Sequence, residues 1–244
     1  MEPDTYPLMA SHEAFHWWFV GRRAVIAGLL ECLALPPSAR VLEAGCGTGG
    51  NLYSLQRLGE VSAFEPHPAA IEIARSRHPD IGVEVGELPD CLPFPKDAFD
   101  LVAALDVLEH VDEDRAALGA LVRFARPGGY VIVTVPTHPY LFGRHDLRLH
   151  HKRRYGVAQF RELCTLEGCE LVYFGAFNTL LAPIAFTVRI AEKLLSLDLG
   201  NQERVPPGPI NRLLAAIFAL EGRLVPRVRL PYGLSHAAII RRLS

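Results

Sequence analysis

The chain has 244 residues, half of them hydrophobic, and a formal net charge of −2. This length fits one α/β domain with an elaboration, or at most two small domains, and the hydrophobic content excludes a disordered protein. The small net charge provides no overall basic field for nucleic-acid binding, although the segment 189–244 is net basic.

Cysteine usage and the N-terminal residues indicate the compartment. The five cysteines are scattered and form no CxxC pair, which argues against a disulfide framework or a zinc site and fits a reducing environment. The opening residues lack a basic region followed by an apolar run, which predicts no signal peptide. No apolar stretch reaches the about 18–20 residues that span a bilayer. We therefore expect a cytoplasmic protein.

Strand and helix patterns alternate along the first two thirds of the chain. Helices are expected at 14–35, 51–58, 69–77, 113–125, 157–167, 179–197 and 210–224. Strands are expected at 40–43, 61–65, 83–85, 99–105, 130–135, 171–174 and 236–241. This order predicts an α/β fold with a doubly wound sheet and right-handed crossovers. The run 99–105 is apolar on both sides, as expected of a central parallel strand.

A glycine-rich turn, VLEAGCGTGGN, follows the strand predicted at 40–43. It places Gly45, Gly47 and Gly49 where the chain must turn sharply and where a ligand can approach without meeting a Cβ atom. The turn leads to the start of the next helix, a favourable place for a ligand. Gly45, Gly47 and Gly50 also satisfy the dinucleotide pattern GxGxxG, so the turn alone fits two classes of cofactor.

Acidic residues end the following strands. Glu65 ends the second strand, about 20 residues after the turn, where a carboxylate can accept hydrogen bonds from ribose hydroxyls. Glu87 follows the third strand and Asp106 the fourth. The carboxyl ends of parallel strands share one edge of the sheet, so we expect these residues to surround a single ligand-binding crevice.

Four segments together resemble the class I methyltransferases that use S-adenosylmethionine (SAM), close to the groups called methyltransferase types 11 and 12. The segments are VLEAGCGTGGN, the acidic end of VSAFEP, LPFPKDAFDLVAALDVLEHV and RPGGYVIVTVP, within about residues 38–175. The resemblance implies a seven-stranded, Rossmann-like methyltransferase sheet with SAM as the cofactor. It also implies these cofactor-binding residues: Arg22, Glu43, Ala44, Gly45, Cys46, Gly47, Asn51, Glu65, Pro66, Glu87, Leu88, Asp106 and Val107.

Two of these positions have structural alternatives. Glu43 is expected either to contact the ligand or to be a buried acid bonded to backbone amides of the turn. Cys46 is also explained as a small side chain in a tight place. Glu87 stands where many relatives have Asp, which makes its contact with the adenine the less secure part of the resemblance.

A polar loop, THPYLFGRHDLRLHHKRRY, follows the fifth strand, beside the place expected for the methyl group. We predict that His145 or His151 acts as a general base, with Asp146 orienting the imidazole. The alternative is that His151 and Arg154 only anchor the loop. A divalent ion held by this cluster is a further alternative, but the spacing matches no metal motif, so we predict no metal site. His110 is expected near the site, either in catalysis or in packing.

Both ends of the chain add to this core. Residues 1–37 are aromatic-rich and resemble a helical lid, and 38–176 form the SAM-binding core. Residues 177–234 form an apolar helical insertion, and 235–244 form the last strand. The insertion fits a substrate cap, a homodimer interface or a peripheral contact with the inner face of a membrane.

The expected function is methyl transfer from SAM to an O or N nucleophile of a small molecule, glycan or lipid-linked intermediate. A non-catalytic SAM-binding protein and an NAD-type oxidoreductase remain the alternatives. Nucleic acid is not expected as a partner, because the basic residues are not interleaved with stacking aromatics.

Overall fold

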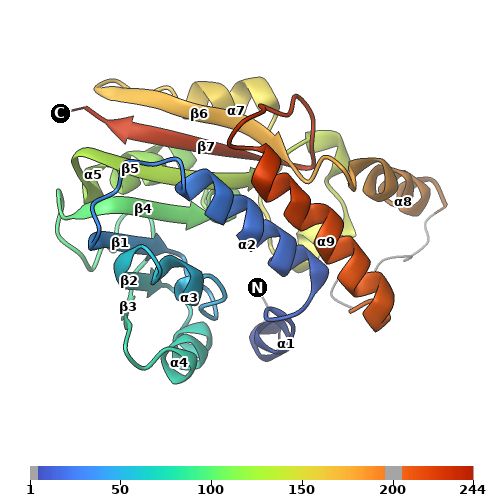
Figure 1. Cartoon of the computed structure of the whole chain (residues 1–244), viewed down its shortest axis with the longest axis horizontal. Coiled ribbons are helices and arrows are strands. Elements are labelled where there is room, and N and C mark those ends of the chain that lie inside the picture. The colour runs from blue at the N-terminus through green and yellow to red at the C-terminus, as the bar shows by residue number, and fades with distance from the viewer. Residues whose placement is uncertain (1–4, 196–204, 244) are drawn as a thin grey trace.

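The structure is a computed structural model and describes residues 5–195 and 205–243. Its centre is a seven-stranded sheet in the order β3-β2-β1-β4-β5-β7-β6 (Figure 1). The strands are β1 (Ala39–Ala44), β2 (Gly59–Glu65), β3 (Gly82–Val85), β4 (Phe99–Leu105), β5 (Ala125–Pro136), β6 (Cys169–Phe177) and β7 (Ser235–Arg242). Strand β7 runs antiparallel to both β5 and β6, whereas the pairs among β1 to β5 are parallel. The expected doubly wound, seven-stranded methyltransferase sheet is confirmed.

Helices cover both faces of the sheet. They are α1 (Thr5–His12), α2 (Trp17–Leu30), α3 (Leu52–Leu55), α4 (Pro68–Arg77), α5 (Asp114–Phe124), α6 (Arg144–Arg148), α7 (Val157–Leu163), α8 (Ala182–Leu195) and α9 (Gly208–Leu224). Two short 3₁₀ turns, Leu108–His110 and Pro139–Leu141, complete the elements. One buried cluster joins the sheet to α2, α3, α4 and α9, and a second joins it to α5 and α7. Every residue of β4 is buried between these layers, as its apolar sequence predicted.

Helices α2 and α9 lie side by side across one face of the sheet (Figure 1). Glycines allow the close contact: a Cβ atom on Gly28 would lie 1.9 Å from the carbonyl oxygen of Gly222. A Cβ atom on Gly21 would lie 2.3 Å from the ring of Phe218. The insertion before the last strand is therefore packed backbone to backbone against the N-terminal segment of the chain.

The N-terminal segment differs from the expected single helix at 14–35. Within that range the structure has one shorter helix, α2, and an additional helix, α1, precedes it. Helix α2 begins only at Trp17, because the backbone of His16 is extended and its Nδ1 atom accepts a hydrogen bond from the amide of Trp18. This bond caps a new helix, which ends at Leu30, several residues before the prolines at 36 and 37. The predicted helix at 157–167 is also shorter and ends at Leu163.

The helical insertion contains α8 and α9, as the sequence predicted. The predicted helix at 179–197 ends beyond the described residues. Among the helices that the structure describes, none combines the length and the apolar character needed to cross a bilayer.

Candidate active site

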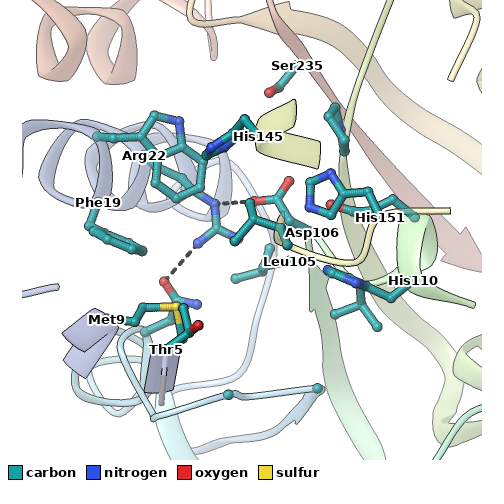
Figure 2. A pocket seen from close by; sticks show the side chains of 18 of the residues that line it. Thr5, Met9, Phe19, Arg22, Leu105, Asp106, His110, His145, His151 and Ser235 are labelled. Carbon is teal, nitrogen blue, oxygen red and sulfur yellow. Dashed lines mark hydrogen bonds and ion pairs between the residues drawn. The ribbon is translucent and has the colours of Figure 1, made fainter. Parts of the chain in front are cut away.

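A cavity of about 1000 Å³ opens at the carboxyl ends of the strands. Its wall combines α1, α2, the glycine turn, the ends of β2 and β4, the polar loop and the insertion. Figure 2 shows Arg22 and Asp106 facing each other in this cavity, with His110 and His151 on the far side of Asp106. Eleven of the thirteen predicted cofactor-binding residues line it: Arg22, Gly45, Cys46, Gly47, Asn51, Glu65, Pro66, Glu87, Leu88, Asp106 and Val107.

The glycine turn requires glycine at two positions that face the cavity. Gly45 has φ +67° and Gly47 has φ +55°, in the left-handed region that side chains disfavour. A Cβ atom on Gly45 would also lie 2.8 Å from Cγ2 of Val107. The amide of Gly47 donates to Oε2 of Glu65 at 3.0 Å, so the end of β2 holds the turn in place.

Glu65 is buried at the cavity wall and accepts a second hydrogen bond, from the amide of His67 at 3.2 Å. Burial raises the pKa of this carboxyl, and the two amide bonds oppose that shift. A carboxylate fixed by two main-chain donors is well placed to accept hydrogen bonds from a vicinal diol such as that of a ribose.

Glu43 and Ala44 lie in β1 and do not line the cavity. One carboxylate oxygen of Glu43 accepts from Nδ2 of Asn51 at 2.8 Å, and the other has no partner among the described residues. Burial raises the pKa of Glu43 to about 8. The buried-acid interpretation fits this placement, with a side-chain amide rather than backbone amides as the partner. Glu43 reaches the cavity only through Asn51.

Arg22 and Asp106 form a buried ion pair of 2.6 Å in the cavity (Figure 2). Nη1 of Arg22 also lies 3.4 Å from Oδ1 of Asn51. Asp106 has φ +59°, and its amide and carboxylate both bond to the hydroxyl of Thr134. One fixed cation beside one fixed carboxylate matches the carboxylate and ammonium of an amino acid, so these residues suit the methionine end of SAM.

Asp146 is fully buried behind the cavity wall, and its carboxylate bonds to other residues of the polar loop. Its Oδ1 lies 3.0 Å from Nδ1 of His151 and 2.7 Å from Nε of Arg154. Its Oδ2 accepts from the amide of Gly143 at 3.0 Å. The rings of His151 and His145 line the cavity, whereas Asp146 does not. With a proton on Nδ1, His151 keeps Nε2 available as an acceptor.

The same loop is anchored to the core by its last residues. The hydroxyl of Tyr155 lies 3.1 Å from the carbonyl oxygen of Leu108 and 2.9 Å from Oδ2 of Asp114, and these two acceptors share its one proton. Arg154 also donates to the carbonyl of Thr137. The loop therefore contains residues of both kinds. Arg154 and Tyr155 anchor it to the core, and His151 lines the cavity.

Sequence reasoning missed Glu109, which is fully buried with both carboxylate oxygens unpartnered among the described residues. Burial, with Asp106 nearby, raises its pKa. Its ligand atoms lie within 4.8 Å of those of His110 and His151, so the three could hold a cation. These three residues form no sequence motif, because they come from two segments that are far apart in the chain. Burial and the neighbouring His151 lower the pKa of His110 to about 4, which keeps that imidazole neutral.

The other half of the cavity is apolar. Leu181, Ile184, Ala185 and Val188 from the start of α8 line it, together with Leu214 from α9. Met9, Trp18 and Phe19 add apolar surface from the N-terminal helices, but on the other side: Met9 lies against the glycine turn, and the Trp18 ring lies against Arg22. The cavity therefore has a polar end at the strand tips and an apolar end beneath the insertion.

Residues 42–133 match the family model described as a methyltransferase domain. A ubiquinone biosynthesis O-methyltransferase from Alkalilimnicola ehrlichii is 35% identical over 120 residues, which are 46% of this chain and 49% of that protein. A probable SAM-dependent methyltransferase from Mycolicibacterium smegmatis is 28% identical over 162 residues, 64% of this chain and 60% of that protein. The chain thus spans only about half to three fifths of the length of these curated relatives.

A solved structure shares the fold across the whole molecule. It is a methyltransferase from Haloferax volcanii in complex with the activator Trm112, with a TM-score of 0.63 and 17% identity. The match covers 96% of this chain and 92% of that one. The sequence matches and the shared fold agree with the geometry of the site, in which the glycine turn and the acidic residues at the strand ends surround the cavity. The chain therefore has the fold of the class I SAM-dependent methyltransferases, and its residues 42–133 resemble their methyltransferase domain in sequence.

Proposed function

We propose that this protein transfers the methyl group of SAM to a hydroxyl oxygen of a small molecule that has an apolar part. The observation that carries this proposal is that His151 lines the cavity while its Nδ1 atom bonds to the buried carboxylate of Asp146. A buried carboxylate bonded to one nitrogen of an imidazole that faces a ligand cavity is the arrangement of a general base. An acceptor that must lose a proton, such as a hydroxyl, needs such a base.

The residues present suit SAM. Arg22 and Asp106 would hold its amino-acid end, Glu65 would accept from the ribose hydroxyls, and the glycines leave room for close approach. When bound, SAM supplies an electrophilic methyl group on a sulfonium sulfur. The task left to this chain is to orient an acceptor oxygen and to remove its proton.

His151 would take that proton at Nε2 while Asp146 stabilises the charge that forms on the ring. Arg154 pairs with the same oxygen of Asp146 at 2.7 Å, which places a positive charge directly against this buried carboxylate. His110, held neutral, packs edge-on against His151 with the ring centroids 4.8 Å apart. A neutral neighbour adds no positive charge that would oppose protonation of His151.

The apolar end of the cavity indicates the rest of the acceptor. Side chains from α8 and α9 provide a hydrophobic surface deep enough for an alkyl or prenyl group. The relative from Alkalilimnicola ehrlichii is named for O-methylation in ubiquinone biosynthesis, a reaction on a hydroxyl group. We therefore favour an acceptor with a hydroxylated ring and an apolar chain over a glycan.

One observation favours a second version of the chemistry. The group formed by Glu109, His110 and His151 could hold a divalent cation, which would lower the pKa of an acceptor hydroxyl directly. In that version His151 is a ligand instead of a base. The two versions give opposite results with a chelator.

The test uses SAM carrying a labelled methyl group, with 4-decylcatechol and unsubstituted catechol as acceptors and mass spectrometry as the readout. We expect a methyl ether from both, with the lower KM for 4-decylcatechol. Calorimetric titration should show SAM binding and no NAD binding. SAM binding without transfer to any hydroxylated acceptor in a cell extract would refute the proposal and favour a non-catalytic binder.

Two neighbouring histidines provide a matched pair of variants. His151→Asn should lower kcat by about 10²–10⁴, the usual contribution of a general base. His150→Asn should leave kcat unchanged, because His150 is exposed and does not line the cavity. Asn also tolerates the left-handed backbone at position 150, where φ is +57°.

A further inference from the structure

Asn178 is a buried polar residue of the cavity wall that the proton-transfer chemistry does not use. It lies between the end of β6 and the start of α8, with 3% of its surface exposed. It has φ +57°, in the left-handed region that Asn tolerates better than most residues other than glycine. It lines the cavity together with Leu181 and Ser235.

The side-chain amide of Asn178 makes no hydrogen bond to any residue that the structure describes. Its Oδ1 is enclosed and unpartnered, whereas Nδ2 is not among the enclosed atoms. Buried amides are almost always paired, since an unpaired one costs free energy. An orphaned amide in a ligand cavity therefore indicates a partner on the ligand.

Hydrogen bonds from the insertion fix the turn that contains Asn178. Oε1 of Glu221, a fully buried residue of α9, accepts from the amides of Thr179 at 2.8 Å and Leu180 at 2.7 Å. On the other side, the amide of Leu234 donates to the carbonyl of Asn178. These contacts fix the backbone of the turn, so the conformation of Asn178 is imposed by its surroundings.

Ser235 is a second polar residue of the cavity wall near the end of β6. It pairs in register with Phe177, the residue before Asn178, and it lines the same cavity. Figure 2 shows Ser235 at the edge of the cavity near His145. The polar end of the cavity therefore has two sides, the His151 side and the Asn178–Ser235 side.

We propose that Asn178, on the cavity wall that Ser235 also lines, recognises a second oxygen of the acceptor, a hydroxyl or carbonyl other than the one that is methylated. Glu221 is a positioning residue for Asn178. This inference rests on the proposed O-methylation and specifies its acceptor: a ring with two oxygen substituents and an apolar chain. A site built to bond a substrate oxygen discriminates strongly against an analogue that lacks it.

The test compares 4-decylcatechol with 4-decylphenol, which has one oxygen fewer. The wild-type protein should prefer the catechol in kcat/KM by roughly tenfold, the effect of one hydrogen bond to a buried group. Glycine and aspartate both tolerate the left-handed backbone, so neither Asn178→Gly nor Asn178→Asp adds strain to the turn. Asn178→Gly should abolish the preference through the KM of the catechol while the Kd of SAM stays unchanged.

Three further variants separate recognition from stability. Thr187→Ala changes an exposed polar residue of α8 that does not line the cavity, and it should keep the full preference. Glu221→Gln keeps a carbonyl oxygen for the turn amides and should keep most of the preference. Glu221→Ala should lose the preference at temperatures where circular dichroism shows the protein folded.

The outcomes are distinguishable. Turnover with an undiminished catechol preference in Asn178→Gly would overturn this inference and leave the proposed function intact. Neither turnover nor calorimetric binding of either probe by the wild-type protein would overturn both.

Discussion

The contact between α2 and α9 can be tested with a single methyl group. A Cβ atom on Gly28 would lie 1.9 Å from the carbonyl oxygen of Gly222, a main-chain atom that cannot rotate away. Gly28→Ala must therefore push the helices apart. Overpacking costs up to about 3 kcal/mol, and the better helix propensity of alanine returns roughly 1 kcal/mol. We expect a net loss of about 2 kcal/mol, or roughly 4–8 °C in Tm for a chain of this size.

Gly119→Ala is the matched control. Gly119 lies inside α5, and the nearest atom to a Cβ there is Nη1 of Arg123 at 3.7 Å. The same substitution should therefore stabilise the protein by up to about 1 kcal/mol, because only helix propensity changes. Thermal unfolding followed by circular dichroism, with urea titration for the free energy, measures both. If Gly28→Ala unfolded at or above the wild-type temperature, the backbone contact would be refuted.

Three other substitutions probe buried acids. Burial raises the pKa of Glu43 to about 8 from an ordinary value of 4.5, so the folded state holds a proton that the unfolded state releases. Wild-type stability should thus fall as pH rises from about 4.5 to about 8, and Glu43→Gln should flatten this dependence in urea titrations across that range. Glu109→Gln should retain activity, since the raised pKa already favours the neutral carboxyl, and EDTA should not inhibit the wild-type enzyme. Loss of activity with EDTA, restored by one added cation, would instead assign Glu109, His110 and His151 to a metal. Asp146→Asn should cost about 3–5 kcal/mol in unfolding experiments, because it leaves the guanidinium of Arg154 buried without its partner. A loss under 1 kcal/mol would contradict that ion pair.

Features carried by one strand and its following turn were predictable from the sequence. The apolar run of β4 and the glycines at 45 and 47 follow from local periodicity and backbone geometry. The meeting of Glu65 and Asp106 follows from a general rule, that parallel strands end at one edge of the sheet. The Asp146–His151 contact was also accessible, since the two residues are close in sequence.

Features that depend on the partner of a segment were not predictable. From the sequence, Gly28 and Gly222 predict only a local loss of helix propensity. Neither helix sequence predicts that these two glycines pack against each other. The orphaned amide of Asn178 depends on a turn held by Glu221, 43 positions along the chain. Such residues acquire their role only when tertiary packing brings together segments whose local patterns are unremarkable.

The two ends of the cavity are mechanically connected through α9. Oδ1 of Asn211, near the start of α9, accepts from the amide of Trp17 at 2.9 Å, and its Nδ2 donates to the carbonyl of Phe15 at 2.7 Å. Together with the glycine contact, these bonds join α9 to α2 along its length. Arg22 belongs to α2 and faces the cofactor end, whereas Glu221 belongs to α9 and holds the acceptor end. Any displacement of α2 that admits the cofactor would therefore carry α9 with it and disturb the turn at Asn178.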